Sequence, residues 1–346
     1  MNAPNKMNLK TPKKRKIAKF RYFIYLILIY LSFAFAFYTS MQNNNKINNE
    51  EFINFLLNGG NLDKFNDFKL ANVVNKTMQV VLNIDFTNPI SLLNNSIFAS
   101  NNTLDNTKKV NLDHNDDYSN LEELKKVSEY IEDPNPVDEE NPIVYIYNTH
   151  QLENYNSKNL DIYGITPNVL MASYILKEKL NKLGIPTIVE DTNISDFLNI
   201  NGWDYSSSYK ATRLLILDKK NKYSSLKYFI DLHRDSVNKD ITTTNIDGKS
   251  YAKILFVIGL EHENYEENIK TASNINDLIN KYYPTLSRGI YKKEGAGVDG
   301  IYNQDLSGNS ILIELGGVDN NIEEVFNTIE ALSKVLNYYI NGEKDE

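Results

Sequence analysis

Short apolar runs that alternate with helix-like stretches fill the second half of the chain, and this alternation constrains the fold more than any other feature. The runs are nearly uninterrupted and rich in β-branched and aromatic residues, which is typical of strands buried in a sheet. They cover residues 143–147, 186–189, 228–232, 254–258 and 311–313, and residues 289–291 are a candidate edge strand. Strands that alternate with helices predict an α/β domain with a mostly parallel sheet flanked by helices.

Three stretches between and after these strands carry the signals of helices. In the first, Thr166 offers an N-cap, Pro167 suits the first helical position, and Gly184 follows the expected last residue. The other two cover about residues 265–283 and 322–339 and show apolar stripes at helical spacing. The α/β domain is therefore predicted to occupy residues 142–341.

A basic tail and an apolar run open the chain. Lysine and arginine crowd residues 1–21, and residues 22–38 are uncharged and apolar. A helix over this run would be about 25 Å long, which approaches the roughly 30 Å of a bilayer core. We expect a cytoplasmic tail followed by a single-pass transmembrane anchor. The alternative is a cleaved signal peptide, since Ala34-Phe35-Ala36 resembles a cleavage site, and both interpretations place the remaining chain outside the cytoplasm.

Two segments separate this anchor from the α/β domain. Residues 43–100 carry apolar positions at roughly helical spacing and are predicted to form a small helical extracytoplasmic region. Residues 101–141 are rich in Asn, Asp and Lys, so a flexible linker is expected there. His114 lies in this linker, where a histidine is usually solvated.

Composition excludes two kinds of function. With a net charge of −8, the chain lacks the basic balance typical of nucleic-acid-binding proteins. Cysteine is absent, so the chain has neither disulfides nor thiolate metal ligands. A catalytic metal would have to be bound by His, Asp or Glu, and the chain has only four histidines.

Polar side chains follow several of the predicted strands, at the positions where ligands bind in open α/β sheets. His150 and Glu153 follow the first strand, His233 follows the third, and Glu314 directly follows the last. Two histidines, one carboxylate and an open fourth position form a common hydrolytic zinc site. His150, Glu153 and His233 could supply this set and leave Glu314 as a general base.

These residues also have less specific interpretations. A histidine at a strand end is often a structural residue that forms local hydrogen bonds. Glu314 is harder to explain in this way, because a carboxylate in an apolar run is costly to bury unless it is paired or bound to a metal. His262 stands between Glu261 and Glu263, and flanking acids favour a solvated loop over a metal site.

Three ordered blocks resemble the signature blocks of the stage II sporulation protein P family. They are residues 145–155 (YIYNTHQLENY), 231–235 (DLHRD) and 302–320, which contain YNQDLS and ELGGVDN. The resemblance covers about residues 142–339. The family's first block usually reads His-Thr-His, whereas this chain has Asn148-Thr149-His150. We take His150 as the ligand, because related amidases place a single histidine just after the first strand.

This resemblance implies a zinc-amidase-like fold and a zinc-dependent N-acetylmuramoyl-L-alanine amidase that also cleaves peptide cross-links of peptidoglycan. It implies zinc bound by His150, Glu153 and His233, with Glu314 as the catalytic base. The family acts during sporulation, in the engulfment step of endospore-forming bacteria. The implied partners are stage II sporulation proteins D and M.

Four further residues are candidates for substrate binding. Arg234 and Arg288 could bind an oxyanion or a peptide carboxylate, although the sequence favours a surface arginine at each position. Asn303 and Gln304 could contact the substrate from a loop. Two other functions remain open. One is a catalytically silent, membrane-anchored scaffold that binds peptidoglycan or partner proteins, and the other is a zinc carboxypeptidase that acts on free peptides.

Overall fold

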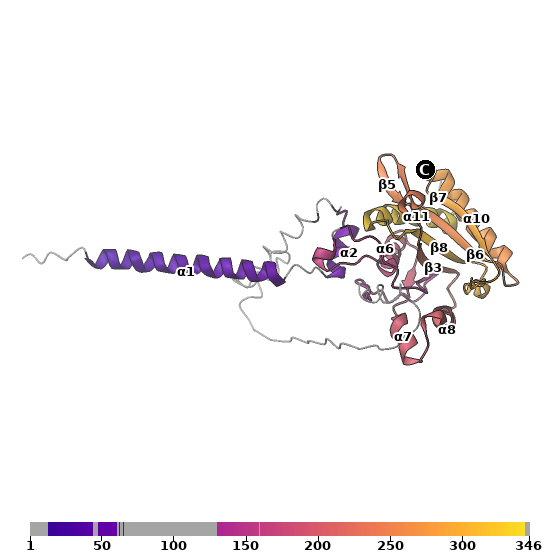
Figure 1. The fold of residues 1–346 in the computed structure, drawn as a ribbon, viewed down its shortest axis with the longest axis horizontal. Coiled ribbons are helices and arrows are strands. Elements are labelled where there is room, and N and C mark those ends of the chain that lie inside the picture. The colour runs from indigo at the N-terminus through magenta and orange to yellow at the C-terminus, as the bar shows by residue number, and fades with distance from the viewer. Residues whose placement is uncertain are drawn as a thin grey trace, which may run out of the picture. The chain divides into compact units, whose positions relative to one another are not determined.

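The computed structural model describes residues 13–43, 48–60, 62, 65, 130–158 and 160–342. The chain divides into two compact units, Met1–Asn45 with Asp63–Leu112, and Lys46–Leu62 with Asp113–Glu346. In the first unit, helix α1 (Lys13–Asn43), drawn in indigo in Figure 1, includes the predicted anchor, and apolar side chains such as Leu28 are exposed on it. Within the described ranges, no helix combines the length and the apolar character needed to cross a membrane.

A six-stranded sheet forms the centre of the second unit, in the order β2-β1-β3-β8-β6-β7 (Figure 1). Four neighbouring pairs run parallel, and the pair β6–β8 runs antiparallel. The predicted α/β fold with a mostly parallel sheet is therefore confirmed. Its strands are β1 (Val144–Tyr147), β2 (Thr187–Val189), β3 (Tyr228–Asp235), β6 (Ile254–Gly259), β7 (Ser287–Lys293) and β8 (Ser310–Gly317).

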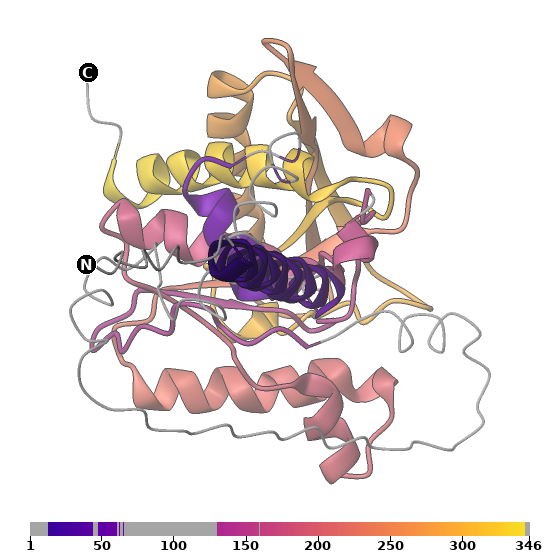
Figure 2. The ribbon, with the colours of Figure 1, turned by 90° about the vertical axis from the view of Figure 1, so that its left-hand side faces the viewer.

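Helices cover both faces of this sheet, as Figure 2 shows. One face carries α6 (Val169–Lys182), α10 (Tyr265–Tyr282) and α11 (Ile322–Asn341). The other face carries α8 (Ser208–Lys222), which packs against α7 (Ile194–Ile200). The smaller elements of this unit are α2 (Asn49–Leu57), α9 (Lys239–Thr242), the hairpin of β4 (Thr243–Ile246) and β5 (Lys249–Ala252), and the 3-10 turns η2 (Leu160–Tyr163), η3 (Tyr205–Ser207) and η4 (Gln304–Leu306).

The core between α8 and the sheet shows on which face of the sheet the predicted site lies. Ile216 of α8 packs with buried Tyr145, Tyr147 and Phe229 of β1 and β3. Side chains alternate along a strand, so the residues two and four positions after Phe229 share its face. These are Asp231 and His233, and the site therefore lies on the face of the sheet that carries α8.

Helix α6 begins later than the sequence predicts. Its N-cap is Asn168, whose side chain accepts the N–H of Met171 at 3.0 Å, and not Thr166. Pro167 lies before the helix, and its carbonyl accepts the N–H of Tyr155 at 2.8 Å. The prediction of a proline at the first helical position was wrong because this contact with the loop after β1 holds the backbone out of the helix.

Other elements were not predicted. Helices α7 and α8 were missed because the apolar stripe of α8 is narrow, with Ala211 and Ile216 as its buried apolar residues. The β4–β5 hairpin was missed because its residues are largely polar and only partly buried.

The end of the predicted linker contacts the α/β domain. Buried Lys177 of α6 donates to both oxygens of Asp133, at 2.7 and 2.6 Å. The amide of Asn135 donates to the side chain of Asn54 in α2 at 3.2 Å. Helix α2 thus belongs to the same compact unit as the sheet. Most of the predicted helical region and linker, with His114, lies outside the described residues.

Candidate metal centre

The loop after β1 carries two of the predicted ligands, and buried Asp231 of β3 holds this loop in place. Thr149 donates its N–H to Oδ1 of Asp231 at 3.0 Å and its hydroxyl to Oδ2 at 2.7 Å. The carbonyl of Glu153 accepts the N–H of the first residue of α6 at 3.1 Å. Because hydrogen bonds join the loop to both β3 and α6, His150 and Glu153 lie beside His233.

The three predicted ligands come together. Their ligand atoms all lie within 4.8 Å of one another. Oε1 of Glu153 is 3.5 Å from Nδ1 of His150 and 3.4 Å from Nδ1 of His233. In a tetrahedral zinc site with bonds of about 2.0–2.2 Å, ligand atoms stand about 3.3–3.6 Å apart, so both distances match. Two imidazole nitrogens and one carboxylate oxygen also suit zinc, and these residues therefore fit the ion.

Charges within this cluster favour positive charge at its centre. Burial by itself would raise the pKa of Glu153, but His233 and His150 hold that pKa well below its usual range. Burial would likewise lower the pKa of His233, but the charges of Asp231 and Glu153 raise it well above its usual range. The same two carboxylates would favour a divalent cation in place of the histidine proton.

Asp231, which we did not predict as a site residue, stands behind His233. It is 1% exposed, and its Oδ1 lies 3.0 Å from Nε2 of His233, within ion-pair distance although not at a hydrogen-bonding angle. A carboxylate beside the second nitrogen of a metal-binding histidine orients the ring and makes it a stronger ligand. Period-two spacing in a strand could have identified Asp231, because it precedes His233 by two residues.

Two tyrosines pack on the ring of His150. Tyr205 of η3 stacks on it, with ring centroids 4.9 Å apart and planes at 22°, and Tyr209 of α8 meets it edge-on at 5.7 Å. These contacts fix the ring in one orientation. No sequence signal marked either tyrosine, because they belong to a segment between strands for which we predicted no structure.

Glu314 lies next to the ligand cluster on the neighbouring strand. It pairs in register with His233 across β3 and β8. Burial, together with the charges of Glu153 and Asp235, raises the pKa of Glu314 to about 7. Its Oε2 is buried and has no hydrogen-bond partner among the described residues. A carboxyl with a pKa near neutrality can accept a proton and return it.

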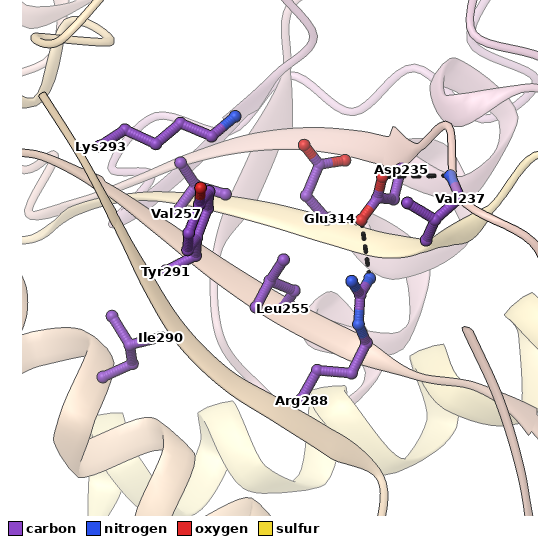
Figure 3. Close-up of a pocket in the computed structure, with 9 residues that line it drawn as sticks. All are labelled: Asp235, Val237, Leu255, Val257, Arg288, Ile290, Tyr291, Lys293 and Glu314. Carbon is purple, nitrogen blue, oxygen red and sulfur yellow. Dashed lines mark hydrogen bonds and ion pairs between the residues drawn. The ribbon is translucent and has the colours of Figure 1, made fainter. Parts of the chain in front are cut away.

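A cavity of about 380 Å³ opens beside Glu314. Figure 3 shows its lining side chains, which come from β8, β6, β7, the end of β3 and the loop that follows β3. They are Asp235, Val237, Leu255, Val257, Arg288, Ile290, Tyr291, Lys293 and Glu314.

The two predicted substrate arginines differ in position. Arg288 lines the cavity and donates to Oδ2 of Asp235 at 2.8 Å (Figure 3). Arg234 instead supports the ligand loop, because its N–H donates to Oε2 of Glu153 at 2.8 Å and its Nε donates to the carbonyl of Asn154 at 2.9 Å. Of the two, Arg288 is the one that faces a substrate-sized space.

Asn303 and Gln304 form internal hydrogen bonds. Gln304 is 1% exposed, and its side chain donates to the carbonyl of Val257 and accepts the N–H of Gly259. Asn303 is buried and donates to the carbonyl of Tyr209. This burial argues against the predicted substrate contacts, because both side chains are used to join the loop at η4 to the sheet and to α8.

The two remaining candidate positions lie outside the ligand cluster. Asn148 is buried, donates to the carbonyl of Leu232 at 2.5 Å and accepts the hydroxyl of Ser173 at 2.9 Å. It therefore joins β3 to α6 on the opposite face of the sheet. His262 contacts the ring of Tyr265 and is not part of the metal-binding group found among the described residues.

Fold and site together define an α/β protein with a cluster of two histidines and one carboxylate, of the kind that binds catalytic zinc. The chain belongs to the stage II sporulation protein P family, which matches residues 63–337. The family resemblance of the three sequence blocks is thereby confirmed.

Stage II sporulation protein P of Bacillus subtilis (strain 168) is 39% identical over an alignment of 209 residues, which covers 58% of this chain and 52% of that relative. The fold is similar to the CwlD amidase of Clostridioides difficile in complex with the GerS lipoprotein, with a TM-score of 0.38 and 12% identity over 57% of this chain and 96% of that one. An N-acetylmuramoyl-L-alanine amidase of Clostridium difficile 630 has a TM-score of 0.34 and 16% identity over 59% of this chain and 100% of that one. TM-scores this low add nothing about function.

Proposed function

We propose that this chain is a zinc-dependent peptidoglycan hydrolase that cleaves the N-acetylmuramoyl-L-alanine amide bond, and also peptide cross-links, during engulfment in sporulation. The observation that carries the proposal is the convergence of His150, Glu153 and His233 beside Glu314. Membership of the stage II sporulation protein P family supports the sporulation setting and the substrate. Stage II sporulation proteins D and M, which the family resemblance implies, are the proposed partners.

Each site residue has a role in the proposed reaction. His150, Glu153 and His233 would hold zinc, which would supply polarisation of the scissile carbonyl and a lowered pKa, toward about 7, for a water molecule. Glu314 accepts a proton from the attacking water and returns it to the leaving nitrogen, so one water is consumed, the C–N bond breaks and the base is restored. Asp231 keeps the ring of His233 oriented.

Attachment to the membrane is part of the same proposal and rests on the sequence of residues 22–38. The basic tail would stay in the cytoplasm, and the α/β domain would lie outside it. Carbonate extraction of membranes, combined with protease treatment of intact cells, tests this. The proposal requires a chain that resists extraction and an α/β domain that is cleaved from outside.

Digestion of purified peptidoglycan by the full-length chain tests the activity. We expect zinc-dependent release of peptides that begin with L-alanine, loss of this release with a chelator, and its return when zinc is added. Glu314→Gln should bind zinc but release no peptide, whereas Glu263→Gln, which changes an exposed carboxylate of the same domain, should behave as wild type. If the folded, zinc-loaded chain releases nothing, alone or with proteins D and M, a binding scaffold is the better explanation.

A further inference from the structure

The cavity beside Glu314 extends away from the ligand cluster. Across the sheet the strands follow one another as β1, β3, β8, β6 and β7. The ligand cluster lies over β1 and β3, Glu314 stands on β8, and most of the cavity lies over β6 and β7. In the proposed reaction Glu314 returns a proton to the leaving nitrogen. That nitrogen and the chain beyond it therefore lie on the cavity side, and in an amide between muramic acid and a peptide this chain is the peptide.

Two cationic side chains line the cavity, and only one of them is neutralised by a carboxylate. Arg288 is paired with Asp235 at 2.8 Å. The ammonium of Lys293 instead lies over two aromatic rings, 5.7 Å from the centroid of Tyr291 and 5.9 Å from that of Tyr302. No ion pair of Lys293 is found within residues 130–158 and 160–342.

Lys293 also faces the catalytic side of the cavity. Figure 3 shows its amino group on the side of Glu314, at the other end of the cavity from Arg288. This cation lines the cavity and has no carboxylate partner among the described residues, so it favours an anionic group of the substrate.

The spacing of the strands indicates where that group lies along the peptide. Lys293 stands on β7, two strands away from Glu314. Neighbouring strands are about 4.8 Å apart, so the two backbones are about 10 Å apart across the sheet. Glu314 pairs with Leu255 and Lys293 with Gly259, so Lys293 also lies four residues further along the sheet, but its side chain reaches back toward Glu314 (Figure 3). An extended peptide advances about 3.3–3.6 Å per residue, so its second or third residue comes within reach of the ammonium of Lys293. Leu255 and Val257 form an apolar floor between the two positions.

We propose that the groove over β6 and β7 binds the peptide part of the substrate and that Lys293 binds a free carboxylate on its second or third residue. This inference rests on the proposed function. It makes Lys293 a specificity-determining residue that distinguishes peptides with free carboxylates from peptides in which these are carboxamides.

A matched set of N-acetylmuramoyl-tripeptides, all with a C-terminal carboxamide, tests the proposal. The side-chain carboxyl groups of the second and third residues are free at both positions in one substrate, at one position in two others, and at neither in the last. Every side-chain carboxyl that is not free is a carboxamide. For the full-length zinc-loaded chain, we expect one free carboxylate to raise kcat/KM about tenfold, as a single charge-assisted contact at a partly exposed site does. The effect should fall mainly on KM, because the contact is the same before and during the reaction.

Three variants separate a specific contact from a structural effect. Lys293→Gln should hydrolyse the carboxylate and carboxamide substrates equally, and Lys293→Arg should keep most of the preference. Lys292→Gln is the matched control, because Lys292 precedes Lys293, is exposed and points to the opposite face. Equal rates of wild type on all substrates, or an unchanged preference in Lys293→Gln, would overturn the inference while leaving the proposed function in place. Failure of wild type to cleave any substrate would instead count against the proposed function itself.

Discussion

Replacing Asp231 with asparagine isolates the electrostatic role of this buried carboxylate. In the variant, the amide oxygen can still accept the N–H of Thr149, and the amide NH₂ can donate to the Thr149 hydroxyl, which can turn toward Thr212 Oγ1 at 3.2 Å. The loop after β1 should therefore stay in place, at a cost of about 1 kcal/mol in the free energy of unfolding. The charge beside Nε2 of His233 is lost, so zinc affinity should fall about 10–100-fold.

Two measurements check this prediction. Zinc affinity is obtained by competition with a chromogenic chelator, and stability by urea unfolding of the metal-free protein. Asp231→Ala should lose zinc affinity to a similar extent but also destabilise the fold by a further 1–3 kcal/mol or so, because it leaves the N–H of Thr149 without its acceptor. Asp305→Asn is the control, because Asp305 pairs with Arg213 outside the ligand cluster. An Asp231→Asn protein that binds zinc as tightly as wild type would refute the reasoning.

Four more predictions follow from the site. The rate of hydrolysis should decline as the pH falls below about 7, because protonated Glu314 cannot accept a proton. Bound zinc should move this decline to lower pH. A rate that keeps rising as the pH falls would argue against Glu314 as the base. Burial raises the pKa of Glu314 in the folded state above its value of about 4.5 in the unfolded state. The stability that protonated Glu314 contributes to the metal-free protein is therefore complete below about pH 4.5 and is lost as the pH rises through about 7. Glu314→Gln should therefore be more stable than wild type above pH 7, by about 2–3 kcal/mol in urea unfolding. His150→Ala should abolish tight zinc binding. Asn148→Ala should lower the free energy of unfolding by about 1–3 kcal/mol but should still bind zinc tightly, and chelator competition with both variants distinguishes the two positions. Gln304→Ala should lower the free energy of unfolding by about 1–3 kcal/mol without changing substrate preference. A rise in KM for one substrate only would instead support a contact between Gln304 and the substrate.

Much of the fold could be predicted because the relevant signals are local. The apolar runs at 143–147, 254–258 and 311–313 became β1, β6 and β8, since a strand buried on both faces needs a nearly continuous apolar sequence. The same reasoning brought strand-end residues to one edge of the sheet, and the structure places the ligand atoms of His150, Glu153 and His233 within 4.8 Å.

The rest depended on how distant segments pack. The apolar runs of β6 and β8 do not indicate whether the two strands are parallel or antiparallel, because both arrangements bury the same side chains. Asn303 and Gln304 carry polar groups suited equally to a substrate and to the backbone, and only their burial decided between the two.

The sequence by itself determined the α/β class, the family and the residue types available to bind a metal. Only the tertiary structure decided that Asp231 stands behind His233, that Tyr205 stacks on His150, and that Lys293 faces the cavity beside Glu314. The physical reason is that strand and helix periodicity is encoded within a few neighbouring residues. The environment of a side chain, by contrast, is set by segments that the chain brings together from far apart in the sequence.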